Sequence, residues 1–439
     1  MKIALRIFFR KVVIHKSEPL PSHGPLIIVG NHPNTFMDPL ILATLFKQRV
    51  GFLGNASIFI NSAVNAIFSY FSVIPVYRDK DVEPGARIDN EKSFRACYKF
   101  LEDKNTLMLF PEGTSYHELK LRKIKTGGAR IALSVEKRND FNLGLRIIPI
   151  GLYYSNPSKF RSKIYVNVGE LISVKDFQEK YLQDEITGVQ ELTKSIKKAL
   201  EKLTITTIDK EQENLFFKVK RIYKEHLISK QDRKKQKEFE LTQEIANAIQ
   251  YFKLTLPNRY EYIKSKIERC NLLLDEFQTS AKYITPMKNR LKQYGILVSG
   301  SLYIILGFPL YLYGLLQNLL PFRLPYWLAK KFTKETEYYA PIMMSLGIIV
   351  FPAYYLASYL LLGVKVAPDP ILITIYLVSL PVSGYFVLHY LNFFQAGIAF
   401  LKIHGIITPK KDLRKELESL KISIFDELDE ARKIYLNRL

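Results

Sequence analysis

The order of apolar and polar positions predicts an α/β domain in the first half of the chain. Between residues 25 and 170, short apolar runs alternate with amphipathic stretches, which is typical of strands that alternate with helices. Residues 90–103 show the pattern of one such helix, with Asn90 as its cap and an apolar stripe for the core. The expected strands are 25–29, 50–53, 73–77, 106–110, 145–152 and 163–168.

The N-terminal segment, residues 1–20, mixes basic and apolar side chains at a helical spacing. This pattern predicts an amphipathic helix that lies on a membrane surface. It fits an ordinary first helix packed against the core equally well. The segment lacks a continuous apolar stretch and a cleavage site of small residues, so it is not expected to be a secretory signal.

Charged residues dominate the middle of the chain. Residues 171–204 have the pattern of a polar amphipathic helix that completes the α/β domain over 21–204, and residues 205–292 that of a charged helical region. Basic clusters at 218–224 and 230–237 fit either a solvated helix face or contact with anionic lipid.

Three stretches that almost lack charged side chains follow, at 293–322, 338–364 and 370–401. Each exceeds the ~20 apolar residues that a helix needs to cross a bilayer. We therefore expect membrane-embedded helical segments over 293–401 and a cytoplasmic helical tail over 402–439.

The membrane topology has two solutions on sequence alone. The linker 323–337 is basic and prefers the cytoplasmic side. If both flanking regions are cytoplasmic too, the first apolar stretch must enter and leave on one face, which Gly307 and Pro309 permit. The other two stretches would then span, joined by an outer turn at 365–369. A simple three-span arrangement places either the basic linker or the tail outside.

Composition narrows the class of partner. The chain has 439 residues, enough for two or three compact units of ~150 residues each. Its 64 Lys and Arg against 42 Asp and Glu give a net charge of +22, which favours an acidic partner such as nucleic acid, a phosphorylated substrate or an anionic membrane. The two cysteines, Cys97 and Cys270, have no metal-ligand spacing. We therefore expect neither a disulfide framework nor a metal site, and a reducing cytosolic face.

The segment around His32 carries the strongest chemical signal. His32 follows a predicted buried strand, and Asp38 precedes Pro39, a residue favoured at the first position of a helix. Asp38 is therefore expected to cap that helix. On a continuous helix the two side chains would point about 120° apart, so they can meet only across a bent loop. There the carboxylate could receive the imidazole N–H.

Other candidates follow in order along the chain. Glu112 and Gly113 lie where a strand meets a turn, a place where backbone amides can face an anion. Arg78 ends a predicted strand and suits a bidentate phosphate contact. Lys125 stands at the start of a predicted helix, whose N-terminus also favours an anion. Each of these residues taken singly is more typical of an ordinary surface position.

The order of four segments resembles that of the four sequence blocks of the glycerolipid acyltransferase superfamily. These segments are NHPNTFMD at 31–38, IPVYR at 74–78, FPEGTS at 110–115 and IIPIGL at 147–152. The resemblance covers residues 1–204 and implies a central mixed sheet flanked by helices, with His32 as the base and Asp38 as its orienter. The fold expected for the chain is this α/β domain, then a long helical region and a C-terminal α-helical membrane domain.

The resemblance also implies which groups bind substrate. It implies no bound cofactor or metal, with acyl-CoA or acyl carrier protein as a co-substrate. The substrate-binding residues implied are Arg78, Glu112, Gly113, Thr114, Ser115 and Lys125.

Two departures point to one branch of the superfamily. Five residues separate His32 from Asp38, where the common form has four, and Ser115 stands where that form has Arg. Both features resemble the fungal-type enzymes that acylate glycerol-3-phosphate or dihydroxyacetone phosphate.

The expected function is therefore transfer of a fatty acyl group from a thioester to one of these acceptors in phospholipid biosynthesis. The protein would be integral to an anionic phospholipid membrane, with the catalytic domain on the cytoplasmic side. Acylation of lysophosphatidate or another lysophospholipid is an alternative, and a non-catalytic lipid-binding scaffold is a further one. Nucleic-acid binding is disfavoured because no recognised motif accompanies the basic clusters. A serine hydrolase or P-loop enzyme is disfavoured because GxSxG and GxxxxGK[ST] are lacking.

Overall fold

The computed structural model describes residues 1–56, 61–77, 90–230, 237–279, 290–363, 369–403 and 410–438. Contacts divide the chain into two compact units. The N-terminal unit comprises Met1–Thr206 together with Thr333–Met344. The helical unit comprises Thr207–Phe332 and Ser345–Leu439.

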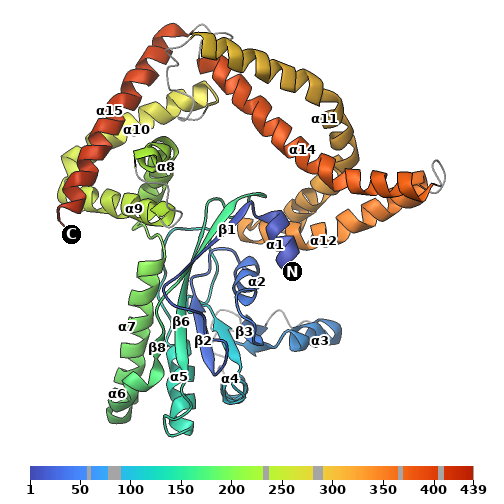
Figure 1. Ribbon diagram of the computed structural model, residues 1–439. Helices are drawn as coiled ribbons and strands as arrows, with labels where there is room; N and C mark the ends of the chain where they lie inside the picture. Colours follow the sequence, from blue (N-terminus) through green and yellow to red (C-terminus); the bar gives the residue numbers. More distant parts are fainter. Residues whose placement is uncertain are drawn as a thin grey trace. The chain divides into compact units, whose positions relative to one another are not determined.

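The N-terminal unit is built on a mixed eight-stranded sheet (Figure 1). Its strands run in the order β1-β7-β6-β2-β5-β3-β4, and β8 pairs with β6. The pairs of β6 with β7 and with β8 are antiparallel, and the other pairs are parallel. The strands are β1 (Lys11–Lys16), β2 (Leu26–Gly30), β3 (Val50–Asn55), β4 (Val73–Val76), β5 (Thr106–Leu109), β6 (Arg146–Tyr154), β7 (Lys163–Val168) and β8 (Ile172–Ser173).

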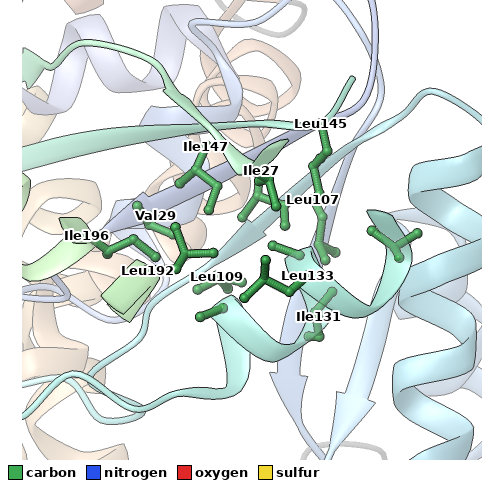
Figure 2. Packing of buried hydrophobic residues seen from close by; sticks show 14 of the residues in the cluster. Ile27, Val29, Leu107, Leu109, Ile131, Leu133, Leu145, Ile147, Leu192 and Ile196 are labelled. Carbon is green, nitrogen blue, oxygen red and sulfur yellow. The ribbon is translucent and has the colours of Figure 1, made fainter. Parts of the chain in front are cut away.

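Helices cover both faces of this sheet. Successive residues of a strand point to opposite faces, so an apolar run such as β2 can bury both sides. Ile27 and Val29 join one core cluster, which includes residues of α4, α5 and α7 (Figure 2). Leu26 and Ile28 join the other, with residues of α1 and α2. The helices are α1 (Lys2–Phe8), α2 (Met37–Ala43), α3 (Ser62–Tyr70), α4 (Glu91–Glu102), α5 (Gly127–Arg138), α6 (Gln178–Gln183) and α7 (Glu185–Leu203), and a short 3-10 helix spans Val174–Phe177.

The sequence expectations for this unit hold in outline, with one difference at the first helix and another at the cap of α4. All six expected strand segments form strands, and the expected mixed sheet flanked by helices is confirmed. The helix expected over 1–20 ends at Phe8 instead, because the β-branched residues of β1 pair in parallel with β7. Asn90 occupies the cap position of α4, but its side chain bonds the main chain of Tyr77.

Helices form the second unit throughout its described residues. Their bounds are α8 (Lys210–Lys230), α9 (Lys237–Thr255), α10 (Pro257–Glu276), α11 (Arg290–Phe332), α12 (Tyr339–Ser358), which begins in the N-terminal unit, α14 (Pro370–Ile403) and α15 (Lys411–Leu436). A 3-10 turn at Thr336–Tyr338 precedes α12, and a π-helix at Tyr359–Gly363 follows it.

Ion pairs between helices account for much of the expected basic cluster at 218–224. Lys218 lies 3.0 Å from Glu268, and Arg221 lies 2.7 Å from Asp275. These pairs favour a structural role for the cluster over contact with lipid. The expected cluster at 230–237 lies largely outside the described residues.

Three helices in the described part of the chain are long and apolar enough to cross a membrane. They cover Tyr294–Phe332, Thr336–Leu361 and Pro370–Ile403. The first and third pack closely, because small residues let the backbones approach. A Cβ on Gly314 would lie 2.6 Å from the Ser383 carbonyl oxygen. The amide of Asn318 donates to the Leu380 carbonyl at 3.0 Å.

Gly151 in β6 gives a test of close backbone packing in the N-terminal unit, where β6 meets the end of α7. A Cβ at this position would lie 2.1 Å from the Leu203 carbonyl oxygen, which the Asn167 side chain holds with a 2.9 Å hydrogen bond. We therefore expect Gly151→Ala to lower the free energy of unfolding by about 1–3 kcal/mol. Gly127→Ala is the control, because a Cβ there meets nothing within 4 Å. Thermal unfolding of both purified variants checks this, and equal melting temperatures would contradict it.

Candidate active site

The structure brings His32 and Asp38 into contact across the loop between β2 and α2. His32 Nδ1 lies 2.8 Å from Asp38 Oδ2. The Asp38 carboxylate is fully buried, while 19% of the His32 side chain is exposed. A buried carboxylate that holds a partly exposed imidazole is the arrangement that an oriented general base requires.

Asp38 does not cap the helix as the sequence suggested. It is the second residue of α2, and Phe36 occupies the cap position. The backbone N–H of Asn34 donates to Asp38 Oδ2 at 2.7 Å. The helix begins one residue before Asp38, so its carboxylate turns back toward the preceding loop and fixes that loop instead.

Tyr154 completes the set of donors around Asp38. Its hydroxyl donates to Asp38 Oδ1 at 2.6 Å from the end of β6. Burial raises the pKa of this hydroxyl well above its ordinary value, and the negative charge of Asp38 adds to the effect. Tyr154 therefore stays protonated and serves as a donor. Sequence reasoning missed it, and the signal available was its place at the end of the strand that contains the fourth block.

Phe110 fixes the plane of the imidazole. The two rings stack with centroids 4.0 Å apart and an interplanar angle of 11°. Because the Asp38 carboxylate accepts at Nδ1, the hydrogen-bond network assigns the proton to that atom. Nε2 then carries the lone pair that can take a proton from a substrate.

Glu112 links the His32 loop to the residues that follow the PEG turn. Its Oε1 accepts from the backbone N–H of His32 at 3.1 Å, and its Oε2 accepts from the backbone N–H of Arg122 at 3.0 Å. Burial raises the pKa of the Glu112 carboxyl, and these two donors oppose the shift. Both carboxylate oxygens thus hold main-chain groups, which gives Glu112 a positioning role.

Both departures from the common sequence pattern meet at Thr35. Its backbone N–H donates to Ser115 Oγ at 2.8 Å. Thr35 has a φ of 34°, a backbone conformation that L-residues rarely adopt. The longer loop between His32 and Asp38 therefore depends on a hydroxyl at position 115, where the common form has Arg.

Cations lie beside the PEG turn. Gly113 has a φ of 72°, and a Cβ there would lie 2.9 Å from Lys125 Nζ. The turn therefore needs glycine both for its backbone and to admit the lysine. Arg122, which sequence reasoning missed, stacks its guanidinium 3.6 Å from the centroid of the Tyr116 ring. Thr114 is half-buried in the same turn.

Arg78 lies outside the described residues, so its expected contact with phosphate stays a prediction. Among the described residues, no group of three or more His, Cys, Asp and Glu side chains is arranged to hold a metal ion.

His117 gives a pH-dependent test of this region. Its Nδ1 lies 3.4 Å from Ser158 Oγ. Burial lowers the pKa of its imidazole, while Glu337 and Asp38 oppose the shift. The unfolded chain therefore binds a proton more readily than the folded one, so stability falls as the pH drops below the ordinary histidine value of about 6.5.

We expect His117→Gln to remove that part of the loss. The drop in melting temperature between pH 7.5 and pH 5.5 should be smaller in the variant than in the unmodified protein, with matching circular dichroism at pH 7.5. An equal drop in both proteins would mean that His117 takes up its proton as readily when folded.

Comparisons with known proteins find acyltransferases similar to this chain. Residues 11–153 match the acyltransferase family. Glycerol-3-phosphate O-acyltransferase 1 of Saccharomyces cerevisiae is 25% identical over 49% of this chain and 40% of its own length. A 1-acyl-sn-glycerol-3-phosphate acyltransferase of Borreliella burgdorferi is 27% identical over 47% of this chain and 78% of its own length.

The solved structure of PlsC, the 1-acyl-sn-glycerophosphate acyltransferase of Thermotoga maritima, aligns with a TM-score of 0.31 at 22% identity, covering 44% of this chain and 75% of its own. The chain matches less than half the length of the yeast relatives, 40% of one and 18% of the other. The family match over residues 11–153 and the sequence relatives show an acyltransferase domain in this chain, which is consistent with the glycerolipid acyltransferase superfamily.

Proposed function

We propose that this chain is a membrane-bound O-acyltransferase that moves a fatty acyl group from a thioester donor to glycerol-3-phosphate or dihydroxyacetone phosphate. The observation that carries the proposal is the orientation of His32. Asp38 holds its Nδ1 at 2.8 Å and Phe110 stacks on the ring, which leaves Nε2 as the proton acceptor. Yeast relatives named glycerol-3-phosphate O-acyltransferases support the acceptor.

The reaction follows from the position of this base. A free imidazole cannot fully deprotonate an alcohol, so Nε2 takes the acceptor's hydroxyl proton while the oxygen attacks the thioester carbonyl carbon. The C–O bond forms, the C–S bond breaks, and the imidazolium returns the proton to the departing thiolate. Asp38 stabilises the imidazolium in between. No covalent acyl-enzyme is needed.

Four backbone amides of this region are not donors to the developing oxyanion in this conformation, because each already donates within the protein. The N–H of Gly113 bonds the Phe110 carbonyl at 3.0 Å, and that of His32 bonds Glu112. The N–H groups of Asn34 and Thr35 bond the side chains of Asp38 and Ser115.

The acceptor's phosphate fits the cationic side of the site. Lys125 lies over Gly113, and the implied Arg78 contact would add a bidentate partner. The charge of +22 also favours anionic lipid together with a phosphorylated acceptor and an acyl-CoA or acyl carrier protein donor. We propose that the catalytic domain faces the cytoplasm, where these soluble substrates are found.

Acylation of lysophosphatidate is the second candidate. Relatives named 1-acyl-sn-glycerol-3-phosphate acyltransferase occur in Borreliella burgdorferi and in Arabidopsis thaliana chloroplasts. The same base and cations would serve an acceptor that already carries one acyl chain.

His32→Ala is the decisive variant. Because general-base catalysis contributes about 10²–10⁴ in rate, we expect turnover to fall by that factor while the fold survives. The assay supplies glycerol-3-phosphate, dihydroxyacetone phosphate and lysophosphatidate separately with each donor, and identifies products by mass spectrometry. Near-normal turnover by the variant would end the proposal. A folded, unmodified protein inactive on every pair would favour a lipid-binding scaffold.

Tyr154→Phe tests the support of Asp38. A hydrogen bond to a charged group contributes about 1.5–3 kcal/mol, so we expect turnover to fall about tenfold or more without the near-complete loss of His32→Ala. Tyr153→Phe is the matched control, because neighbouring residues of a strand point to opposite faces. Steady-state kinetics decide, and equal rates in the two variants would remove Tyr154 from the site.

A further inference from the structure

A segment at the junction of two apolar helices belongs to the unit that contains the active site. We name Thr333–Met344 the strap. It follows α11 and includes the start of α12, at Tyr339–Met344, and its contacts place it in the N-terminal unit. The Thr35 hydroxyl donates to the Glu337 carbonyl at 2.9 Å, and the Ser158 hydroxyl donates to the Thr336 carbonyl at 3.4 Å. Thr35 is the same residue that Ser115 holds from the other side.

Apolar contacts continue the attachment. Phe36 and Tyr338 meet edge to face with ring centroids 6.3 Å apart. Ala340 and Met344 are buried in the core cluster that also contains Met37 of α2 and residues of α1. The strap is thus anchored at the catalytic loop by hydrogen bonds and at the sheet by buried side chains.

The surface of the N-terminal unit near this attachment is apolar and basic. Phe36 is 45% exposed, and Ile3 and Ile7 of α1 are 75% and 47% exposed. Lys2 and Arg6 lie on the same helix. Exposed apolar side chains beside cations are the features with which an amphipathic helix binds an anionic bilayer. The apolar helix α12 begins at Tyr339, within the strap, and continues beyond it to Ser358.

We propose that this face docks on the bilayer and that the strap, the N-terminal unit and the bundle of α8, α9, α10 and α15 all share one side of the membrane. The bilayer is then the partner of the active-site loop itself.

The order of the segments along the chain fixes the side of the membrane on which the apolar helix α11 begins and ends. In the described residues between Thr206 and Arg290, no helix is long and apolar enough to cross a membrane. The N-terminal unit and the helices α8 to α10 therefore lie on the same side. The strap belongs to the N-terminal unit, so α11 must begin and end on that side as well.

The C-terminal helix α15 packs against α8 and α10. Arg269 of α10 binds Glu416 of α15 through two hydrogen bonds of 2.6 and 2.9 Å. Tyr223 of α8 donates to Asp429 of α15 at 2.5 Å. The chain after α14 has therefore returned to the starting side. We infer that α12 and α14 cross the bilayer as a pair, with Asp369 on the far side.

α11 can begin and end on one face because it is not straight. It contains Pro309, Pro321 and Pro325, each of which removes a backbone hydrogen bond and bends a helix. Figure 1 shows the helix as a curved ribbon. Lys330 and Lys331 in its last turn suit a return to the same surface.

Cysteine labelling tests this arrangement independently of the proposed activity. The background replaces the two buried cysteines, Cys97 and Cys270, with alanine. Single reporters are Lys194→Cys in α7, Glu335→Cys in the strap, Asp369→Cys before α14, and Asp412→Cys in α15. Sealed membrane vesicles are treated with a membrane-impermeant maleimide, with or without detergent.

Lys194, which is 79% exposed in α7, reports the side of the N-terminal unit. We expect the reporters at 335 and 412 to label under the same condition as the one at 194, and the reporter at 369 to label under the opposite one. The proposal is overturned if position 335 or 412 follows position 369, or if position 369 follows position 194.

A second measurement tests the contact of the strap with the loop. In the same background, a short bifunctional maleimide should join Phe36→Cys to Tyr338→Cys, detected as linked peptides by mass spectrometry. The control pair is Phe36→Cys with Lys194→Cys. Failure of the first pair to link, or equal linking of both pairs, would detach the strap from the active site.

Discussion

The buried carboxylate of Asp38 is the group on which the candidate active site depends. An isolated charge in a protein interior is costly unless hydrogen bonds satisfy it. Three donors meet this need: the His32 imidazole, the Asn34 backbone and the Tyr154 hydroxyl. They come from the loop after β2 and from the end of β6, so the sheet must be complete before the carboxylate is satisfied. The imidazole of His32 is therefore oriented only once the sheet has formed.

Glu112 is a second buried carboxylate that hydrogen-bond donors satisfy, as they do Asp38. It too is buried, and it too holds main-chain donors, from His32 and Arg122. The two carboxylates hold His32 at two places: Asp38 accepts from its ring nitrogen, and Glu112 accepts from its backbone N–H. Both carboxylates are buried, and both are satisfied by donors from the protein itself.

The strap gives the loop a third support and continues into the apolar helix α12. Its hydrogen bond from Thr35 to Glu337 holds the residue whose backbone conformation is least favourable in the loop. A loop one residue longer than the common form gains its order from distant parts of the chain, namely Ser115 and Glu337.

The sequence by itself determined the strands, the charged helices, the apolar stretches and the identity of His32 and Asp38 as partners. These features have short-range signals, since apolar runs, helical periodicity and ordered motifs are written in neighbouring residues. The helical pattern of the first residues predicted too late an end for the first helix, because the pairing of β1 with β7 overrides that local pattern. Sequence reasoning also misread Asp38 as a cap, because the exact start of a helix depends on the loop before it.

Only the tertiary structure decided what surrounds the imidazole. Tyr154 lies 116 positions from Asp38 and Glu337 lies 302 positions from Thr35, and no local pattern connects residues so far apart. Phe110 looked like an ordinary strand end until the sheet placed it on His32. Contacts of this kind arise from how strands are ordered and how helices close on them. The order of the strands depends on which residues are buried across the whole unit, whereas a motif carries information only about its own few residues.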